Sequence, residues 1–398
     1  MIKVAKEGEI TWFSGLGPLD MPEPLPKGIS LHIGHRGMGV EVQGLVGALP
    51  LRNGDTLHII PKISKVNFLR LLFKSEGIQP DLEREYESFV SYSVENEENI
   101  DSIVARQLIL SISEILKRSP KQGRVRVKKS GTFAIGQLDV VETALNISCH
   151  SRDPIVYTVS EKTSDIPENR IITEAVIRAL PLLKQADLGS LSGVYEKWLK
   201  RFNRSQSIRS DLEYIERGFA SELYGGPRDY YRKALMLSKV VLGNNGLGYG
   251  DVATLQGDAI LMQTATVFEK YLRNIISDRY IRDGYIVVKG GLGKTTLYTN
   301  GSFELDPDIV VYRNGVPLLI ADAKYKEPTI DDHYQMHAYL TSNNLKRGLI
   351  LAPLYTGGSV VSREYITPQG ILVTTVFLPM SNLSVTEEYL GTVVERFA

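Results

Sequence analysis

Short runs of alternating apolar and polar residues fill much of the first 65 positions of the chain. One run spans 40–47, and a second, at 56–63, follows an Asn-Gly-Asp turn at 53–55. Alternation with a period of two is typical of strands whose two faces meet different surroundings, and Asn-Gly is a common hairpin turn. The N-terminal part of the chain is therefore predicted to form a small sheet or barrel.

Apolar residues spaced by three or four positions recur through the middle of the chain and predict helices. The expected helices cover 67–73, 103–116, 168–184, 196–204 and 230–242. A Gly/Asn-rich segment at 244–250 is the clearest break between structured parts. The chain is thus predicted to be an α+β multidomain protein. Its expected parts are a β-rich N-terminal region at 1–100, a mixed or helical middle region at 101–249 and a C-terminal α/β region at 250–398.

The balance of charges narrows the classes of function. The 398 residues include 46 basic and 46 acidic side chains, so the net charge is zero. This excludes a polycationic protein that binds nucleic acid through its overall charge, and any nucleic-acid site must be a local basic surface. The single cysteine, Cys149, excludes a cysteine-based zinc site within one chain. No apolar run approaches the roughly 20 residues of a membrane helix, so no membrane partner is predicted and a cytoplasmic location is expected.

The densest local group of positive charges lies between positions 117 and 129. Within it, Arg124 and Arg126 flank Val125, and Lys128 follows Val127, which would place three cations on one face of a strand. Such a face can contact DNA phosphates, contact a partner protein, or remain solvated. The sequence leaves these interpretations open, and DNA binding by Arg124, Arg126 and Lys128 is the hypothesis to test.

The most informative stretch lies in the C-terminal region, at 306–326. Two β-rich segments flank an Asn-Gly turn at 314–315, so they are expected to pair as a hairpin. Asp308 begins the first strand, and the second runs through apolar residues into Asp322 and Lys324. Because side chains alternate along a strand, Asp322 and Lys324 share one face. Asp308 is expected to lie beside Asp322.

Two carboxylates and an ammonium group at strand ends suit phosphodiester hydrolysis. Carboxylate oxygens bind Mg²⁺, with Mn²⁺ as a substitute, and the metal activates a water and offsets charge on the phosphate. Lys324 would orient or help to deprotonate that water and stabilise negative charge. The alternative is a plain salt bridge between Lys324 and either Asp308 or Asp322.

The Pro-Asp pair at 307–308, the hairpin and the apolar approach to Asp322 resemble the PD-(D/E)xK nuclease superfamily. The resemblance implies an α-β-β-β-α-β core. Beside the hairpin, its elements would be a helix at 263–283, strands at 285–289 and 348–352, and a helix at 330–343. It also implies that Glu269, on the first helix, joins Asp308 and Asp322 at the metal. Gln335 resembles the glutamine of RecB-like members, which supports the site by hydrogen bonding. Ordinary helix-surface positions are the alternative for both residues.

Six short segments precede this motif in a fixed order. They lie at 44–47, 57–63, 67–69, 136–139, 165–171 and 231–235. Over nearly the whole chain, this succession is similar to the McrC family, the nuclease subunit of McrBC-type restriction systems. One departure is Gln137, which stands where a basic residue is expected.

The McrC resemblance implies an endodeoxyribonuclease that acts on modified double-stranded DNA in antiviral defence. It also implies a hexameric McrB-like AAA+ GTPase as partner, whose ring the N-terminal half docks into and stimulates, with 1–100 as the docking region. Two other functions remain open. One is a non-cleaving adaptor that activates the AAA+ NTPase through a vestigial nuclease fold, and the other is a nuclease that reads unmodified DNA. The intact Asp308, Asp322 and Lys324 favour an enzyme.

A glycine-rich segment at 290–296 superficially resembles a nucleotide-binding loop. Val288 occupies the position where such a loop requires its first glycine, and no βαβ series follows. We therefore predict a turn beside the nuclease sheet, able to contact DNA backbone, and no bound nucleotide.

Overall fold

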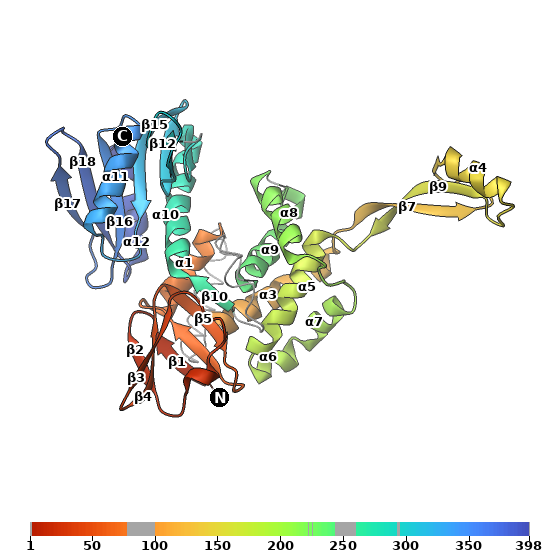
Figure 1. The fold of residues 1–398 in the computed structure, drawn as a ribbon, viewed down its shortest axis with the longest axis horizontal. Helices are drawn as coiled ribbons and strands as arrows, with labels where there is room; N and C mark the ends of the chain where they lie inside the picture. Colours follow the sequence, from red (N-terminus) through yellow and green to blue (C-terminus); the bar gives the residue numbers. More distant parts are fainter. Residues whose placement is uncertain are drawn as a thin grey trace. The chain divides into compact units, whose positions relative to one another are not determined.

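In the computed structural model, the two ends of the chain fold together and the middle of the chain forms a separate unit (Figure 1). The described residues are 2–77, 100–221, 223–224, 226–242, 260–292 and 295–397. The first unit comprises Met1–Ile103 with Gly243–Ala398, and the second comprises Val104–Leu242. The segment 244–250, where the main boundary was expected, lies outside the described residues, so the three-part division stays a prediction.

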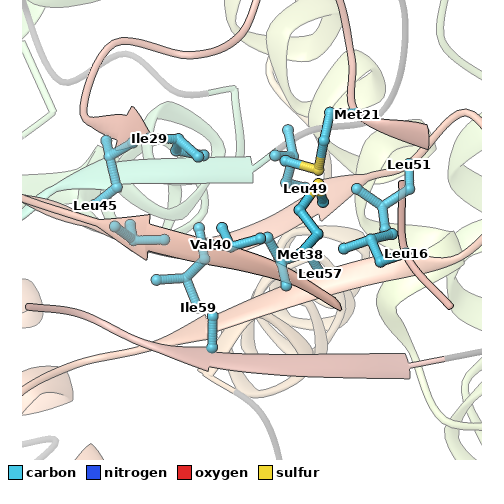
Figure 2. Close-up of a cluster of buried hydrophobic side chains, with 12 residues drawn as sticks. Leu16, Met21, Ile29, Met38, Val40, Leu45, Leu49, Leu51, Leu57 and Ile59 are labelled. Carbon is cyan, nitrogen blue, oxygen red and sulfur yellow. The ribbon is translucent and has the colours of Figure 1, made fainter. Parts of the chain in front are cut away.

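Two small sheets form the N-terminal part of the first unit, as the alternating pattern predicts. One contains, in order, β1 (Ile2–Lys6), β6 (Thr56–Ile60), β5 (Leu45–Pro50) and β10 (Ile260–Gln263). The other contains β2 (Ile10–Phe13), β4 (Gly37–Val42) and β3 (Ile29–Gly34). Their apolar side chains, such as Val40, Leu49 and Leu57, pack into one core (Figure 2). The run at 40–47 is two strands rather than one, because Gly44 turns the chain with a φ of 71°.

A six-stranded mixed sheet forms the C-terminal part of the same unit. Its strands, in order, are β11 (Tyr285–Val288), β14 (Ile309–Arg313), β15 (Val316–Ala323), β16 (Arg347–Leu354), β18 (Leu372–Pro379) and β17 (Val361–Ile366). The predicted hairpin is confirmed, since β14 pairs antiparallel with β15. Asn314 and Gly315 between them both have positive φ, as a tight hairpin turn requires. β15, β16 and β18 run parallel and carry the buried apolar residues typical of such strands.

Helices pack against this sheet where the sequence predicts them. α10 (Thr264–Tyr280) and α11 (Ile330–Ser342) correspond to the helices expected at 263–283 and 330–343. Met336 and Leu340 of α11 are fully buried in a cluster with Ile320 of β15 and Ile350 of β16. The same unit contains α1 (Lys65–Ser75), α12 (Leu383–Leu390) and α13 (Val393–Phe397).

The second unit is mainly helical and carries a two-stranded arm. Its helices include α3 (Ile100–Arg118), α5 (Pro167–Ala179), α6 (Gln185–Ser190), α7 (Ser192–Leu199), α8 (Ile208–Ala220) and α9 (Asp229–Val241). The arm consists of β7 (Gly123–Gly131) paired antiparallel with β9 (Ile155–Thr163), the short β8 (Gln137–Leu138) and α4 (Val140–Ser148) at its end (Figure 1). The expected helix at 168–184 ends at Ala179. The one expected at 196–204 begins at Ser192 and ends at Leu199, while α4, α6 and α8 were not expected.

Buried polar contacts join the helices of this second unit. The hydroxyl of Tyr231 donates to Oδ1 of Asn169 over 2.8 Å, and Arg170 forms a bidentate pair with Asp211 at 2.6 and 2.9 Å. Two of the segments that carry the McrC resemblance, 165–171 and 231–235, therefore meet in space. No helix among the described residues is long and apolar enough to cross a membrane.

Candidate functional site

The two predicted site carboxylates lie side by side at one end of the β14–β15 hairpin. Asp308 immediately precedes β14, and the register pairs Ile309 with Ala321, next to Asp322. Oδ2 of Asp308 accepts a hydrogen bond from the backbone N–H of Ala323 over 2.9 Å. The side chains of Asp308 and Asp322 are only 15% and 3% exposed. The hairpin thus holds two carboxylates together where solvent has little access.

Lys324 and Gln335 complete the group that the sequence predicts. Nζ of Lys324 lies 2.6 Å from Oδ2 of Asp322 and donates to Oε1 of Gln335 over 2.9 Å. Gln335 in turn donates from Nε2 to the hydroxyl of Tyr339 over 2.7 Å, so its amide orientation is fixed from both ends. The salt bridge considered as an alternative is present, and it is part of the same cluster.

A third carboxylate that the sequence analysis missed also faces Lys324. Oδ1 of Asp332 lies 3.5 Å from Nζ of Lys324, while its Oδ2 accepts from the backbone N–H and the hydroxyl of Thr329. These contacts cap the N-terminus of α11. The sequence signal was the Thr-x-x-Asp spacing at 329–332, which is typical of a helix start.

Glu269 reaches the site from α10, but its carboxylate is already paired. Nη1 of Arg273 lies 2.6 Å from its Oε1, and Nζ of Lys289 lies 3.0 Å from the same atom. Lys289 also lies 3.6 Å from Oδ1 of Asp308, so this lysine sits between the two carboxylates. Sequence reasoning missed Lys289, although a cation directly after the apolar β11 strand was the available signal. The metal-binding role predicted for Glu269 stays a prediction.

Burial and mutual repulsion shift the pKa values of these groups. Burial raises the pKa of Asp308 to about 7, and the negative charges of Asp322 and Glu269 add to this effect. Burial also raises the pKa of Asp322, against the opposing influence of Lys324. For Lys324, burial lowers the pKa, but the hydrogen bond and charge of Asp322 outweigh it and the net pKa is raised. Lys324 is therefore an ammonium at neutral pH.

The chemistry of this group of donors fits a divalent cation held by two carboxylates. Asp308 and Asp322 supply hard oxygen ligands, and Oδ2 of Asp322 is buried with no hydrogen bond beyond its ion pair with Lys324. Mg²⁺ commonly takes one or two protein carboxylates and keeps several waters. Within the parts of the chain that the structure describes, no three His, Cys, Asp or Glu side chains are arranged to hold a metal ion. The oxygen atoms of Asp308 and Asp322 have the chemistry that Mg²⁺ prefers.

An aromatic cluster surrounds the residue after Lys324, and a lysine from the end of β6 joins it. The ring of Tyr325 packs against Phe268 at 5.5 Å and against Tyr355 at 6.1 Å between centroids. Nζ of Lys62, just after β6, lies 6.0 Å from the Tyr325 ring and 5.6 Å from the Tyr355 ring. Tyr325 adjoins Lys324, and Phe268 adjoins Glu269. The contact between their rings therefore links the end of β15 to α10.

Glu7 is the charged member of this neighbourhood that lies deepest. It is 1% exposed, accepts from the hydroxyl of Thr264 over 2.7 Å, and accepts from the backbone N–H of Lys62 over 3.4 Å. Burial raises the pKa of Glu7, and these hydrogen bonds and the Lys62 charge oppose the rise. The contacts tie β1, the end of β6 and the start of α10 together beneath Tyr325.

The predicted basic strand is β7 of the arm, in the other unit. Arg124, Arg126 and Lys128 are all exposed there. Lys128 is paired with Asp139, at 2.8 Å, and with Glu142. Arg124 and Arg126 form no ion pair with another residue that the structure describes. The three cations therefore do not form one uniform free surface, and their DNA-binding role stays a prediction.

The end of the arm carries apolar side chains that the sequence analysis did not single out. We call this set the arm-tip surface; each member is 55–70% exposed. Its members are Phe133, Ile135, Val140, Val141, Leu145 and Ile147. Large exposed apolar patches are typical of surfaces that bind another molecule.

Together, the fold and the site define a class: an α+β protein of two units, with a buried Asp–Asp–Lys group at the end of a hairpin in a mixed sheet. The family described as McrBC 5-methylcytosine restriction system component matches residues 40–352. The chain belongs to this McrBC family, which confirms the predicted resemblance.

Solved structures give a fold comparison at low sequence identity. The chain is similar to one in the refined half-complex from a tetradecameric assembly of Thermococcus gammatolerans McrB AAA+ hexamers with bound McrC. The identity is 13%, the TM-score is 0.62, and all of both chains is covered. A second match, in the cryo-EM structure of the Thermococcus gammatolerans McrBC complex, has 13% identity and a TM-score of 0.46 over 70% of this chain and 88% of the other. A search of the curated proteins finds no significant match.

Proposed function

We propose that this chain is the Mg²⁺-dependent endodeoxyribonuclease subunit of an McrBC-like restriction complex. The observation that carries the proposal is the convergence of Asp308, Asp322 and Lys324 at one end of the β14–β15 hairpin. Membership of the McrBC family supports it. Apart from the two short strands at 295–296 and 304–305, the order α10, β11, β14, β15, α11, β16 also supports an α-β-β-β-α-β core.

Each residue of the site has a distinct task in this proposal. Asp308 and Asp322 would hold the metal; when bound, Mg²⁺ lowers the pKa of a water and offsets charge on the phosphate. Lys324, kept protonated by Asp322, stabilises the negative charge that develops on the phosphate oxygens. The raised pKa favours this electrostatic task over the base role also considered for Lys324. Gln335 holds the ammonium group in place.

We further propose an AAA+ hexamer of the McrB type as the partner. The solved structure similar in fold over the full chain contains McrB AAA+ hexamers with bound McrC. The arm-tip surface is the surface we assign to this partner, because it is apolar, exposed and carried on a projecting arm. Double-stranded DNA containing 5-methylcytosine is the substrate that the family description suggests.

The test is cleavage by a variant of one buried carboxylate. Asp322→Asn should abolish cleavage of methylated plasmid DNA in the presence of Mg²⁺, GTP and an AAA+ partner of the McrB type. The matched control is Asp331→Asn, which changes an exposed carboxylate of α11 and should cleave like the wild type. Cleavage at the wild-type rate by Asp322→Asn would overturn the assignment. An inactive wild type that still stimulates its partner's GTPase would favour the adaptor.

A further inference from the structure

A small hairpin stands directly ahead of Asp308 in the chain. β12 (Thr295–Thr296) pairs antiparallel with β13 (Glu304–Leu305). The turn between them is well hydrogen-bonded: the N–H of Leu297 donates to the carbonyl of Phe303 over 2.9 Å, and the N–H of Gly301 to the carbonyl of Tyr298 over 3.0 Å. The hairpin therefore has a defined shape and is no extended loop.

Two aromatic rings project from this hairpin into solvent. Tyr298 is 55% exposed and Phe303 is 73% exposed, and their rings meet edge to face at 5.9 Å between centroids. Phe303 has a φ of 59°, a conformation that costs a bulky side chain free energy. Strained residues persist where the surroundings impose them, and they gather at sites that bind other molecules. As a result, the rings of Tyr298 and Phe303 are both exposed, and no other part of the described chain covers them.

The base of the hairpin is fixed to the proposed active site. The N–H of Gly290 donates to the carbonyl of Pro307 over 2.8 Å, and the N–H of Leu292 donates to the hydroxyl of Tyr312 over 3.2 Å. Leu305 packs against the apolar cluster of the nuclease sheet. Five positions separate Phe303 from Asp308, a reach of at most about 17 Å. This length corresponds to about five steps along one DNA strand.

The chemistry of the hairpin points away from phosphate groups. Residues 295–305 contain no Lys or Arg, and Oδ2 of Asp306, just after the hairpin, lies 4.0 Å from Nζ of Lys289. The hairpin between β12 and β13 therefore offers aromatic rings rather than cations to a ligand. Exposed aromatic rings instead stack on bases or wedge between base pairs, as in many proteins that bend or open a duplex.

We propose that Tyr298 and Phe303 form an aromatic wedge that contacts the bases of duplex DNA beside the phosphodiester to be cleaved. This inference rests on the proposed nuclease function, because it takes DNA at Asp308 as given. DNA is the ligand we expect at these rings because β13 leads directly through Asp306 and Pro307 into Asp308. DNA bound at the carboxylates must therefore pass close to the hairpin.

The experiment measures DNA binding without cleavage, in the full-length chain carrying Asp322→Asn. The wedge variant is Tyr298→Ser with Phe303→Ser. The matched control is Tyr365→Ser with Ile366→Ser, on β17, an edge strand of the six-stranded sheet, where both side chains are also exposed. Circular dichroism checks that each variant is folded. A conservative variant, Tyr298→Phe with Phe303→Tyr, keeps both rings.

The wedge variant should bind a short duplex about 10-fold more weakly than its parent, since stacking on one base is worth roughly 1–3 kcal/mol. Its dependence on salt should be unchanged, because no phosphate contact is lost. The control and the conservative variant should bind like the parent. In the parent, 2-aminopurine placed within about five steps of the cleaved bond should change its fluorescence on binding, and this change should disappear in the wedge variant.

The outcomes separate this inference from the proposed function. If the parent binds DNA and the wedge variant binds it equally well, the wedge is wrong and the nuclease proposal stands. If the wedge variant loses self-association in sedimentation experiments while its DNA affinity is unchanged, the rings form a contact between copies and the inference is overturned. If the parent binds no DNA at all, the wedge is overturned, while the cleavage test of Asp322→Asn with the AAA+ partner decides the nuclease proposal separately.

Discussion

Asp308 is a carboxyl group whose ionised form is disfavoured by its surroundings. It is largely buried next to Asp322 and Glu269, and its pKa is raised from 3.8 to about 7. The folded protein therefore holds this proton more tightly than the unfolded chain does. As the pH rises from 3.8 through about 7, the free energy of unfolding should fall, because the folded state must accept an unfavourable charge.

Asp308→Asn should relieve this penalty in metal-free protein. With EDTA at pH 8, the free energy of unfolding should rise by about 1–3 kcal/mol, and the gain should shrink at pH 5. Asparagine can still accept the hydrogen bond from the N–H of Ala323. Urea unfolding at the two pH values measures the effect, with Asp331→Asn as the control. An equal gain at both pH values would show that charge is not the cause.

Gln335 offers a test of how Lys324 is held. Gln335→Leu removes the acceptor at 2.9 Å from Nζ of Lys324 while keeping the size of the side chain. A hydrogen bond to a charged group is worth about 1.5–3 kcal/mol, so the cleavage rate should fall by about 10-fold or more. DNA affinity should change little. Thr341→Ala, at an exposed position of the same helix, is the control. An unchanged cleavage rate in Gln335→Leu would show that Gln335 has no role in the site.

The residues of the site differ in how visible they are in the sequence. Asp308, Asp322 and Lys324 could be placed together because one hairpin carries all three, and strand alternation fixes which side chains share a face. Lys289 and Asp332 could not be placed beside them from the sequence. Their positions depend on β11 pairing beside β14 and on the start of α11, and neither contact is encoded by spacing near the motif.

At the scale of elements, local patterns predicted several strands and helices, such as those at 56–63, 103–116 and 230–242, but not their partners. The β14–β15 hairpin is found as the Asn-Gly turn predicts, and the helices at 263–283 and 330–343 are found where the PD-(D/E)xK resemblance placed them. β10 is different: it pairs with β5, more than two hundred positions away. Likewise, Lys62 meets Tyr325 only through tertiary packing. Such contacts join the N-terminal sheets to the site, and no local sequence pattern predicts them.

The arm is the element for which a binding prediction is sharpest. Val141 and Leu145 lie one turn apart on α4 and are 70% and 59% exposed. Val141→Ser with Leu145→Ser should leave folding unchanged and lower the affinity for the AAA+ partner by at least about 10-fold, because both would be buried in the complex. The measurement is stimulation of the partner's GTPase at increasing concentrations of the variant. Undiminished stimulation would move the docking surface elsewhere.

At the scale of the whole molecule, a chain of zero net charge must hold DNA through local cations. The arm offers Arg124 and Arg126, whereas the neighbouring Lys128 is neutralised by Asp139 and Glu142. The face can therefore contribute two phosphate contacts rather than the three suggested by the sequence. The number of phosphate contacts then sets how strongly DNA binding by the arm should depend on salt concentration.

Arg124→Gln with Arg126→Gln should reduce the slope of the logarithm of the DNA-binding constant against the logarithm of salt concentration by about 1.8, at roughly 0.9 per phosphate contact. Lys128→Gln, in contrast, should leave that slope nearly unchanged, because its ammonium already faces two carboxylates of the arm. Salt titrations of the complex assembled with its AAA+ partner supply the comparison. If the double variant instead loses assembly, while its remaining DNA binding keeps the wild-type slope, the two arginines contact the partner and not DNA.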